Sequence, residues 1–140
     1  MSPNRGAPTP AIAIEGDDVR ARFRGVERDD KLAARLANVC ADVSTDRATL
    51  AEAGRDWWPV AMRWALDGEV PALAAAVARP ASVGEVSAVL ALCDAERVPV
   101  TVAAGRSGVC GGSVPVHGGV VLDLTGLEGI VDVDDTSLLL

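Results

Sequence analysis

Six glycines separate two runs of β-branched residues in the stretch "VPVTVAAGRSGVCGGSVPVHGGVVLDL", residues 98–124. Glycine accepts backbone conformations with φ > 0, so successive N–H groups of such a segment can point into one concavity that binds an anion. Arg106, Ser107 and Ser113 would add side-chain donors. The spacing indicates a loop that binds a phosphate-bearing ligand; the alternative is a long hairpin-like connection with glycine turns. The glycines are Gly105, Gly108, Gly111, Gly112, Gly118 and Gly119.

Three well-known glycine motifs do not match this loop. A Walker loop ends in Gly-Lys-Ser/Thr, and the loop contains no Lys. A dinucleotide fingerprint has the spacing G-x-G-x-x-G and enters a helix, whereas here the spacing is G-x-x-G-x-x-G-G and a strand follows. A nucleophile elbow has the pattern G-x-S-x-G, but Val109 lies two residues after Ser107. The loop is therefore predicted to bind through its backbone.

Regular elements flank the loop from residue 75 onward. The pattern predicts strands over 75–79, 99–103, 119–124 and 129–135, with a helix after the first of them. Ser82 and Glu85 form a capping box at the start of this helix. The fold class is α+β, a β-α-β-β unit with a right-handed crossover expected between the first two strands. The predicted apolar stripe of the helix is Val86, Val89, Leu90 and Cys93.

The region before residue 75 is predicted to be helical. Residues 1–18 are rich in Pro, Gly and acidic residues and are expected to form a loose leader. Residues 19–74 form a helical N-terminal segment, with one helix from about Glu27 to Ala41 and a second that Ser44 caps and that runs through Glu52. Three of the chain's four aromatic residues lie in "GRDWWPVAMRWALDGEVP", which is either a packed apolar connector or a surface against a cofactor or another domain.

Composition limits the function classes. The chain has 140 residues, the length of one domain, and is 49% hydrophobic, enough for a core. Its formal charge of −7 argues against nucleic acid as a partner. The sequence contains no apolar run of 18 residues, the length that a membrane-spanning helix needs. The three cysteines are widely spaced, so we expect reduced thiols in a cytoplasmic protein and no metal site, although a site with His117 is formally possible.

The run "RPASVGEVSAVLALCDAERVPVTVAAGRSGVCGGSVPVHGGVVLDLTGLEGI", residues 79–130, resembles the start of a known domain. It is similar to the FAD-binding domain of the vanillyl-alcohol oxidase/p-cresol methylhydroxylase superfamily, and the resemblance covers about residues 54–140. The nearest branch comprises bacterial proteins similar to alkyldihydroxyacetonephosphate synthase and to glycolate or lactate oxidases. The resemblance implies that residues 75–140 are the first part of an FAD-binding domain.

The resemblance also implies which residues bind the cofactor. In the family this loop wraps the FAD pyrophosphate with backbone amides, and a side chain at Gly108 would lie where the cofactor does. Arg106 stands at a usual glycine, and Ser107 stands where some members carry a His that links FAD covalently, so we expect non-covalent FAD. His117 is read as a turn residue and Asp123 as a strand-end residue. The predicted cofactor-binding residues are Ala104, Gly105, Arg106, Ser107, Gly108, Gly111 and Gly112.

The activity implied by the resemblance is oxidation of a hydroxy acid or alcohol by an FAD-linked oxidase or dehydrogenase. One alternative is an ether-lipid transferase of the alkyldihydroxyacetonephosphate synthase kind that uses FAD. Another is a non-enzymatic binding module that a separate chain completes. Family enzymes are several hundred residues long, so we expect this chain to be an incomplete fragment, inactive alone, and we name no catalytic residue.

Overall fold

The computed structural model describes residues 19–25, 29–130, 132 and 136–137. The expected leader, residues 1–18, lies outside the described residues, and so does most of the strand expected over 129–135. The three residues of that stretch that are described, Gly129, Ile130 and Asp132, are not in a strand.

The central sheet has four strands in the order β2-β4-β6-β5. Strand β6 (Val120–Asp123) lies in the middle and pairs in parallel with β4 (Ala76–Ala78) and with β5 (Val100–Ala103). Strand β2 (Val43–Ser44) pairs antiparallel with the outer edge of β4. Strand β5 follows β4 in the chain, but the two strands are not neighbours in the sheet. Strand β6 lies between them.

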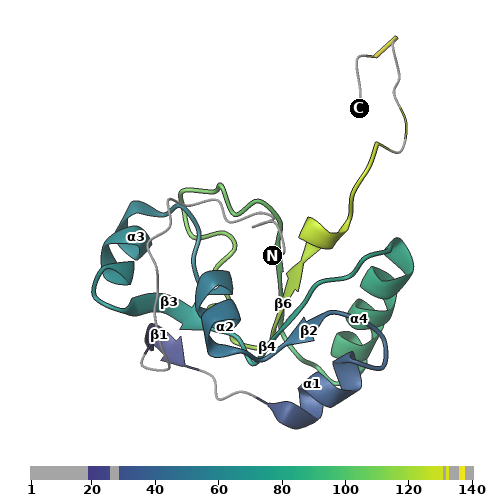
Figure 1. The fold of residues 1–140 in the computed structure, drawn as a ribbon, viewed down its shortest axis with the longest axis horizontal. Helices are drawn as coiled ribbons and strands as arrows, with labels where there is room; N and C mark the ends of the chain where they lie inside the picture. The colour runs from purple at the N-terminus through teal and green to yellow at the C-terminus, as the bar shows by residue number, and fades with distance from the viewer. Residues whose placement is uncertain (1–18, 26–28, 131, 133–135, 138–140) are drawn as a thin grey trace.

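Every residue of β4 and of β6 is buried. Since successive residues of a strand point to opposite faces, the sheet is covered on both faces at these two strands. Figure 1 shows α1 (Asp30–Leu36) and α4 (Val83–Ala95) on one side of the sheet and α2 (Arg47–Ala53) on the other. One core contains Leu32, Leu36, Cys40, Ala75, Ala76, Ala78, Val89, Cys93, Val120 and Leu122. The other contains Val19, Leu50, Ala51, Ala53, Ala65, Val70, Leu73, Ala74, Val77, Ala103 and Val121.

The second sheet has two parallel strands, β1 (Arg20–Gly25) and β3 (Glu69–Leu73), and α3 (Pro59–Ala65) precedes β3. These strands lie in the segment 19–74, which also holds α1, α2 and α3. The predicted helical segment therefore contains helices and, in addition, strands that the sequence pattern did not predict.

Local signals explain the helix boundaries. The Ser82 side chain accepts a hydrogen bond from the Glu85 amide at 3.2 Å, so the predicted capping residue of α4 is confirmed. The predicted cap of the second helix was wrong: Asp46 accepts the amide of Thr49, and Ser44 lies in β2.

Two further predictions about the helices need correction. The first helix is shorter than the predicted stretch from Glu27 to Ala41: α1 begins after its cap Asp29 and ends at Leu36, and Cys40 lies beyond it. In α4, Val89 and Cys93 are buried as predicted, but Leu90 is 43% exposed.

Candidate functional site

The glycine loop, residues 104–119, connects β5 to β6 and begins at the carboxyl end of β5. In open α/β sheets, ligands bind at the carboxyl ends of parallel strands. Four residues of the loop have positive φ: Arg106 at 48°, Gly111 at 79°, Gly118 at 71° and Gly119 at 67°. Positive φ at Arg106 is uncommon for a residue with a side chain and indicates that surrounding contacts hold it.

The backbone of the upstream segment holds the loop. The Trp57 amide donates to the carbonyl oxygen of Gly108 at 3.0 Å and to that of Arg106 at 3.3 Å. In a trans peptide the carbonyl and the N–H point in opposite directions. The amides of Ser107 and Val109 therefore face away from Trp57, and neither donates a hydrogen bond within the described part of the chain.

Glycines lie close in sequence to the Ser107 and Val109 amides. A Cβ atom built on Gly105 or on Gly112 would meet no atom of the described residues within 4 Å, so this part of the chain leaves open space beside both glycines. At Gly108 an added Cβ would lie 3.6 Å from Asp56 Oδ2, on the side of the upstream segment. The expectation that a side chain there would lie where the cofactor does stays a prediction.

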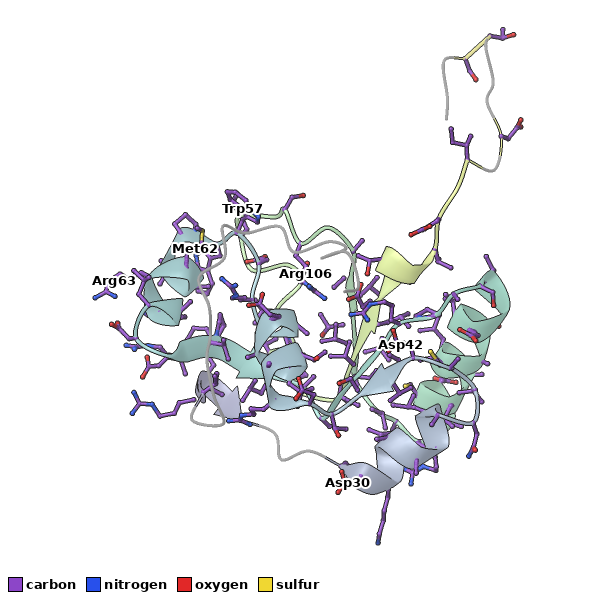
Figure 2. All side chains as sticks on the ribbon, in the orientation of Figure 1. Asp30, Asp42, Trp57, Met62, Arg63 and Arg106 are labelled. Carbon is purple, nitrogen blue, oxygen red and sulfur yellow. The ribbon has the colours of Figure 1, made fainter. Side chains whose placement is uncertain are left out.

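The predicted binding residues differ in exposure. Ala104, Gly105, Ser107, Gly108 and Gly112 are exposed, and Gly111 is half-buried. Arg106 is only 9% exposed, and its guanidinium donates to Asp123 Oδ2 at 2.7 Å. Figure 2 shows its side chain directed into the body of the protein, whereas that of Arg63 extends away from it. The Arg106 side chain is therefore not a ligand-facing donor, in contrast to the sequence-based expectation.

Asp123, the last residue of β6, is the most heavily bonded carboxylate near the loop. Its Oδ1 accepts from the amide and the hydroxyl of Thr125 at 3.0 and 2.7 Å, and Arg79 donates to Oδ2 at 3.2 Å. Burial raises the pKa of Asp123, but the hydrogen bonds from Thr125 and the charges of Arg106 and Arg79 outweigh it, so its pKa lies below the usual value. The carboxylate is ionised and structural, as its strand-end position predicts.

Asp56 is a buried carboxylate that sequence reasoning missed. Its Oδ1 accepts the Trp58 amide at 3.0 Å, and this bond orients the start of α3. Its Oδ2 is buried and accepts no hydrogen bond from the described residues, and the buried Nε of Arg106 likewise has no acceptor. Only an acid that precedes two tryptophans marks this position in the sequence.

An aromatic cluster lies beside the loop. The Trp58 and Trp64 rings are 5.4 Å apart, and Phe23 stacks on Trp58 at 6.3 Å. A Cβ on Gly111 would lie 3.6 Å from the Trp58 ring, so the cluster supports the far end of the loop. This contact agrees with a packed connector, and the alternative of a surface against a cofactor stays a prediction.

Neither a metal cluster nor a membrane-spanning helix is found among the described residues. No group of three or more His, Cys, Asp or Glu side chains lies close enough to hold a metal ion. None of the helices in this part of the chain is long and apolar enough to cross a bilayer.

Comparison with known proteins decides the family. Residues 74–140 match the family model of an FAD binding domain. Residues 74–140 belong to this FAD-binding family. The family predicted from the glycine loop and its flanking strands is thus confirmed, as is the mixed α+β fold of an FAD-linked oxidase domain.

Relatives of this FAD-binding segment are oxidoreductases by name. The chain is 38% identical over 58 residues to a probable mitochondrial D-2-hydroxyglutarate dehydrogenase of Oryza sativa subsp. indica, an alignment that covers 41% of the chain and 10% of the relative. It is 33% identical over 63 residues to glycolate oxidase subunit GlcD of Bacillus subtilis (strain 168), covering 45% of the chain and 13% of the relative.

A solved structure extends the likeness beyond the family segment. An alkyldihydroxyacetonephosphate synthase superposes with a TM-score of 0.70 at 16% identity, over 82% of this chain and 24% of that one. At this identity the match shows the fold alone. The aligned share is larger than the FAD-binding segment, so part of the upstream chain shares the fold too. The chain spans about a tenth of the length of the curated relatives.

Proposed function

We propose that the glycine loop binds the pyrophosphate of FAD and that the chain is the N-terminal part of an FAD-dependent oxidoreductase. The observation that carries this proposal is the pair of amides of Ser107 and Val109, which face away from Trp57 and have no acceptor among the described residues. Backbone N–H groups that converge on one side are suited to phosphate oxygens. Gly105 and Gly112 leave the neighbouring space open, so a ligand can approach the backbone closely.

The chain's own residues have distinct tasks in this proposal. The backbones of Ala104 to Gly108 and of Gly111 and Gly112 line the phosphates, and the Ser107 hydroxyl is exposed beside them. The Arg106 side chain is held by Asp123 and contributes through its backbone alone. Two carboxylates close to the loop, those of Asp123 and Asp56, are both buried. The donor set therefore fits an anion.

The reaction we propose for the whole protein is oxidation of a hydroxy acid or alcohol. Support comes from the two curated relatives, whose names specify 2-hydroxyglutarate and glycolate. When bound, FAD would accept the hydride equivalent removed from the substrate. The chain alone is expected to be inactive, because no residue of it is assigned to the substrate. The alternative reaction, that of an ether-lipid transferase, is supported only by the likeness in fold to alkyldihydroxyacetonephosphate synthase.

Two finer properties belong to the same proposal. FAD is held non-covalently, because Ser107 stands where a flavin-linking His would be and its hydroxyl does not form that bond. The protein is cytoplasmic, as its three free cysteines favour.

The test is a titration of the isotopically labelled 140-residue chain with inorganic pyrophosphate, ADP and FAD, followed by the NMR signals of its amides. We expect saturable shifts of the Ser107 and Val109 signals with all three ligands and none with riboflavin, which has no phosphate. Acid precipitation of the FAD-loaded chain should leave all flavin in the supernatant. Loop signals that stay in place at millimolar pyrophosphate would refute the proposed site.

A further inference from the structure

Arg106 combines two features that are costly separately. It has a φ of 48°, in a region that side chains disfavour, and it is buried with a charged group. A residue keeps such a conformation only where its surroundings determine it. The contacts that hold Arg106 are therefore informative about what keeps the loop in shape.

Asp123 is a fixed point to which the Arg106 side chain binds. Thr125 donates twice to Oδ1, and Arg79, which directly follows β4, donates to Oδ2 through Nε at 3.3 Å and through its terminal nitrogen at 3.2 Å. These bonds orient the carboxylate without help from the loop. The 2.7 Å contact from Arg106 then ties the loop to the end of the central strand β6.

The backbone of Arg106 is held from a second direction. Its carbonyl oxygen accepts the Trp57 amide, while its guanidinium reaches Asp123. A return of φ to the negative region would rotate that carbonyl away from Trp57. Since the Ser107 amide belongs to the same peptide unit, its direction would change as well.

We propose that Arg106 and Asp123 are positioning residues that hold the glycine loop in its anion-binding conformation through their buried ion pair. Neither side chain is a ligand of the anion. This inference rests on the proposed function, because the conformation matters through the outward amides of Ser107 and Val109. It also assigns a reason for the strained backbone: positive φ at residue 106 is the conformation in which its side chain reaches Asp123 and its carbonyl reaches Trp57.

The test uses two single variants of the 140-residue chain, Arg106→Gly and Asp123→Asn, and the double variant. Glycine tolerates the positive φ, so the first variant removes the ion pair without adding strain. Asparagine keeps the shape of the carboxylate and removes its charge. The matched control is Arg63→Ala, which removes an exposed ion pair with Asp67 and leaves the Arg106–Asp123 pair in place.

The first readout needs no ligand. Hydrogen exchange of the Trp57 amide reports the two bonds to the loop, and that of Val89 in the middle of α4 reports global stability. We expect protection of the Trp57 amide to fall at least about tenfold in each single variant. It should fall no further in the double variant, because both substitutions remove the same ion pair between Arg106 and Asp123. Val89 protection should change less than that of Trp57, and Arg63→Ala should change neither.

The second readout is the dissociation constant for inorganic pyrophosphate, which should rise at least about fivefold in the same variants. Arg106→Lys keeps the charge and should recover part of both effects. Unchanged Trp57 protection, or an equal loss at Trp57 and Val89, would overturn the positioning role. A wild-type chain that does not respond to pyrophosphate would instead refute the proposed function, whatever the exchange data show.

Discussion

Gly105→Val tests whether the open side of the loop is where the ligand lies. A Cβ at this position meets no atom within 4 Å in the part of the chain that the structure describes, and Gly105 is not among the glycines with positive φ. The protein itself should therefore accept valine without a clash. In the proposed complex the same side chain would occupy space next to the phosphates.

The expected magnitudes have opposite signs for stability and for binding. Replacing glycine where the backbone conformation allows a side chain stabilises a protein by about 0.4–1 kcal/mol, through the unfolded chain. A hydrogen bond to a charged group contributes about 1.5–3 kcal/mol. If valine separates the ligand from one of the two amides, at Ser107 or Val109, FAD and ADP should bind about tenfold to a hundredfold more weakly.

The assay measures both quantities on one sample. Amide shifts during FAD titration give the dissociation constant, and thermal unfolding gives the melting temperature. The matched control is Gly84→Val in the first turn of α4, where an added Cβ meets only Ser82 Oγ at 3.7 Å. An unchanged FAD constant in a folded Gly105→Val chain would refute our placement of the ligand.

Two more outcomes concern stability. Gly119→Ala would place a Cβ 2.0 Å from the Pro99 carbonyl oxygen at a φ of 67°, so urea unfolding should show a loss of at least about 2 kcal/mol, while Gly84→Ala should show none. Asp123 has a lowered pKa in the folded state, so its stabilisation is present above the usual aspartate value, near pH 4, and is lost as the pH falls below it. Asp123→Asn should flatten the fall of unfolding free energy between about pH 5 and pH 3; an equally steep fall would contradict the assignment.

Local signals made the second half of the fold predictable. Ser82 and Glu85 mark the start of α4 within four residues of each other, and β-branched runs mark β5 and β6. Strands β1 and β3 carry no comparable signal. The sequence of β1 is "RARFRG", and β3 contains Pro71, which cannot donate to a ladder. Their pairing depends on each other: Arg20 lies opposite Glu69, and Arg22 donates to the same carboxylate at 2.6 Å.

The sequence predicted where the candidate site lies, but not which contacts hold the loop in its conformation. Glycine spacing and the family resemblance located the loop, because the positions of glycines can be read directly from the sequence. The direction of the Arg106 side chain depends on Asp123, 17 residues later, and the loop carbonyls depend on Trp57, far upstream. A single sequence holds no record of such contacts. The Arg106 side chain, whose partner is distant in the chain, was therefore given a ligand role.

Strand β2 lies outside the stretch that matches the family model, although it pairs with a strand inside that stretch. The family match begins at residue 74, yet Val43 and Ser44 cover the outer edge of β4, and the Arg79 amide donates to the Asp42 carbonyl oxygen at 2.8 Å. A piece excised at residue 74 would expose a row of unpaired backbone groups, which is a template for aggregation. It would also lose Trp57 and with it the support of the loop. Recombination can therefore transfer this cofactor-binding segment between proteins only where the recipient supplies its own edge strand.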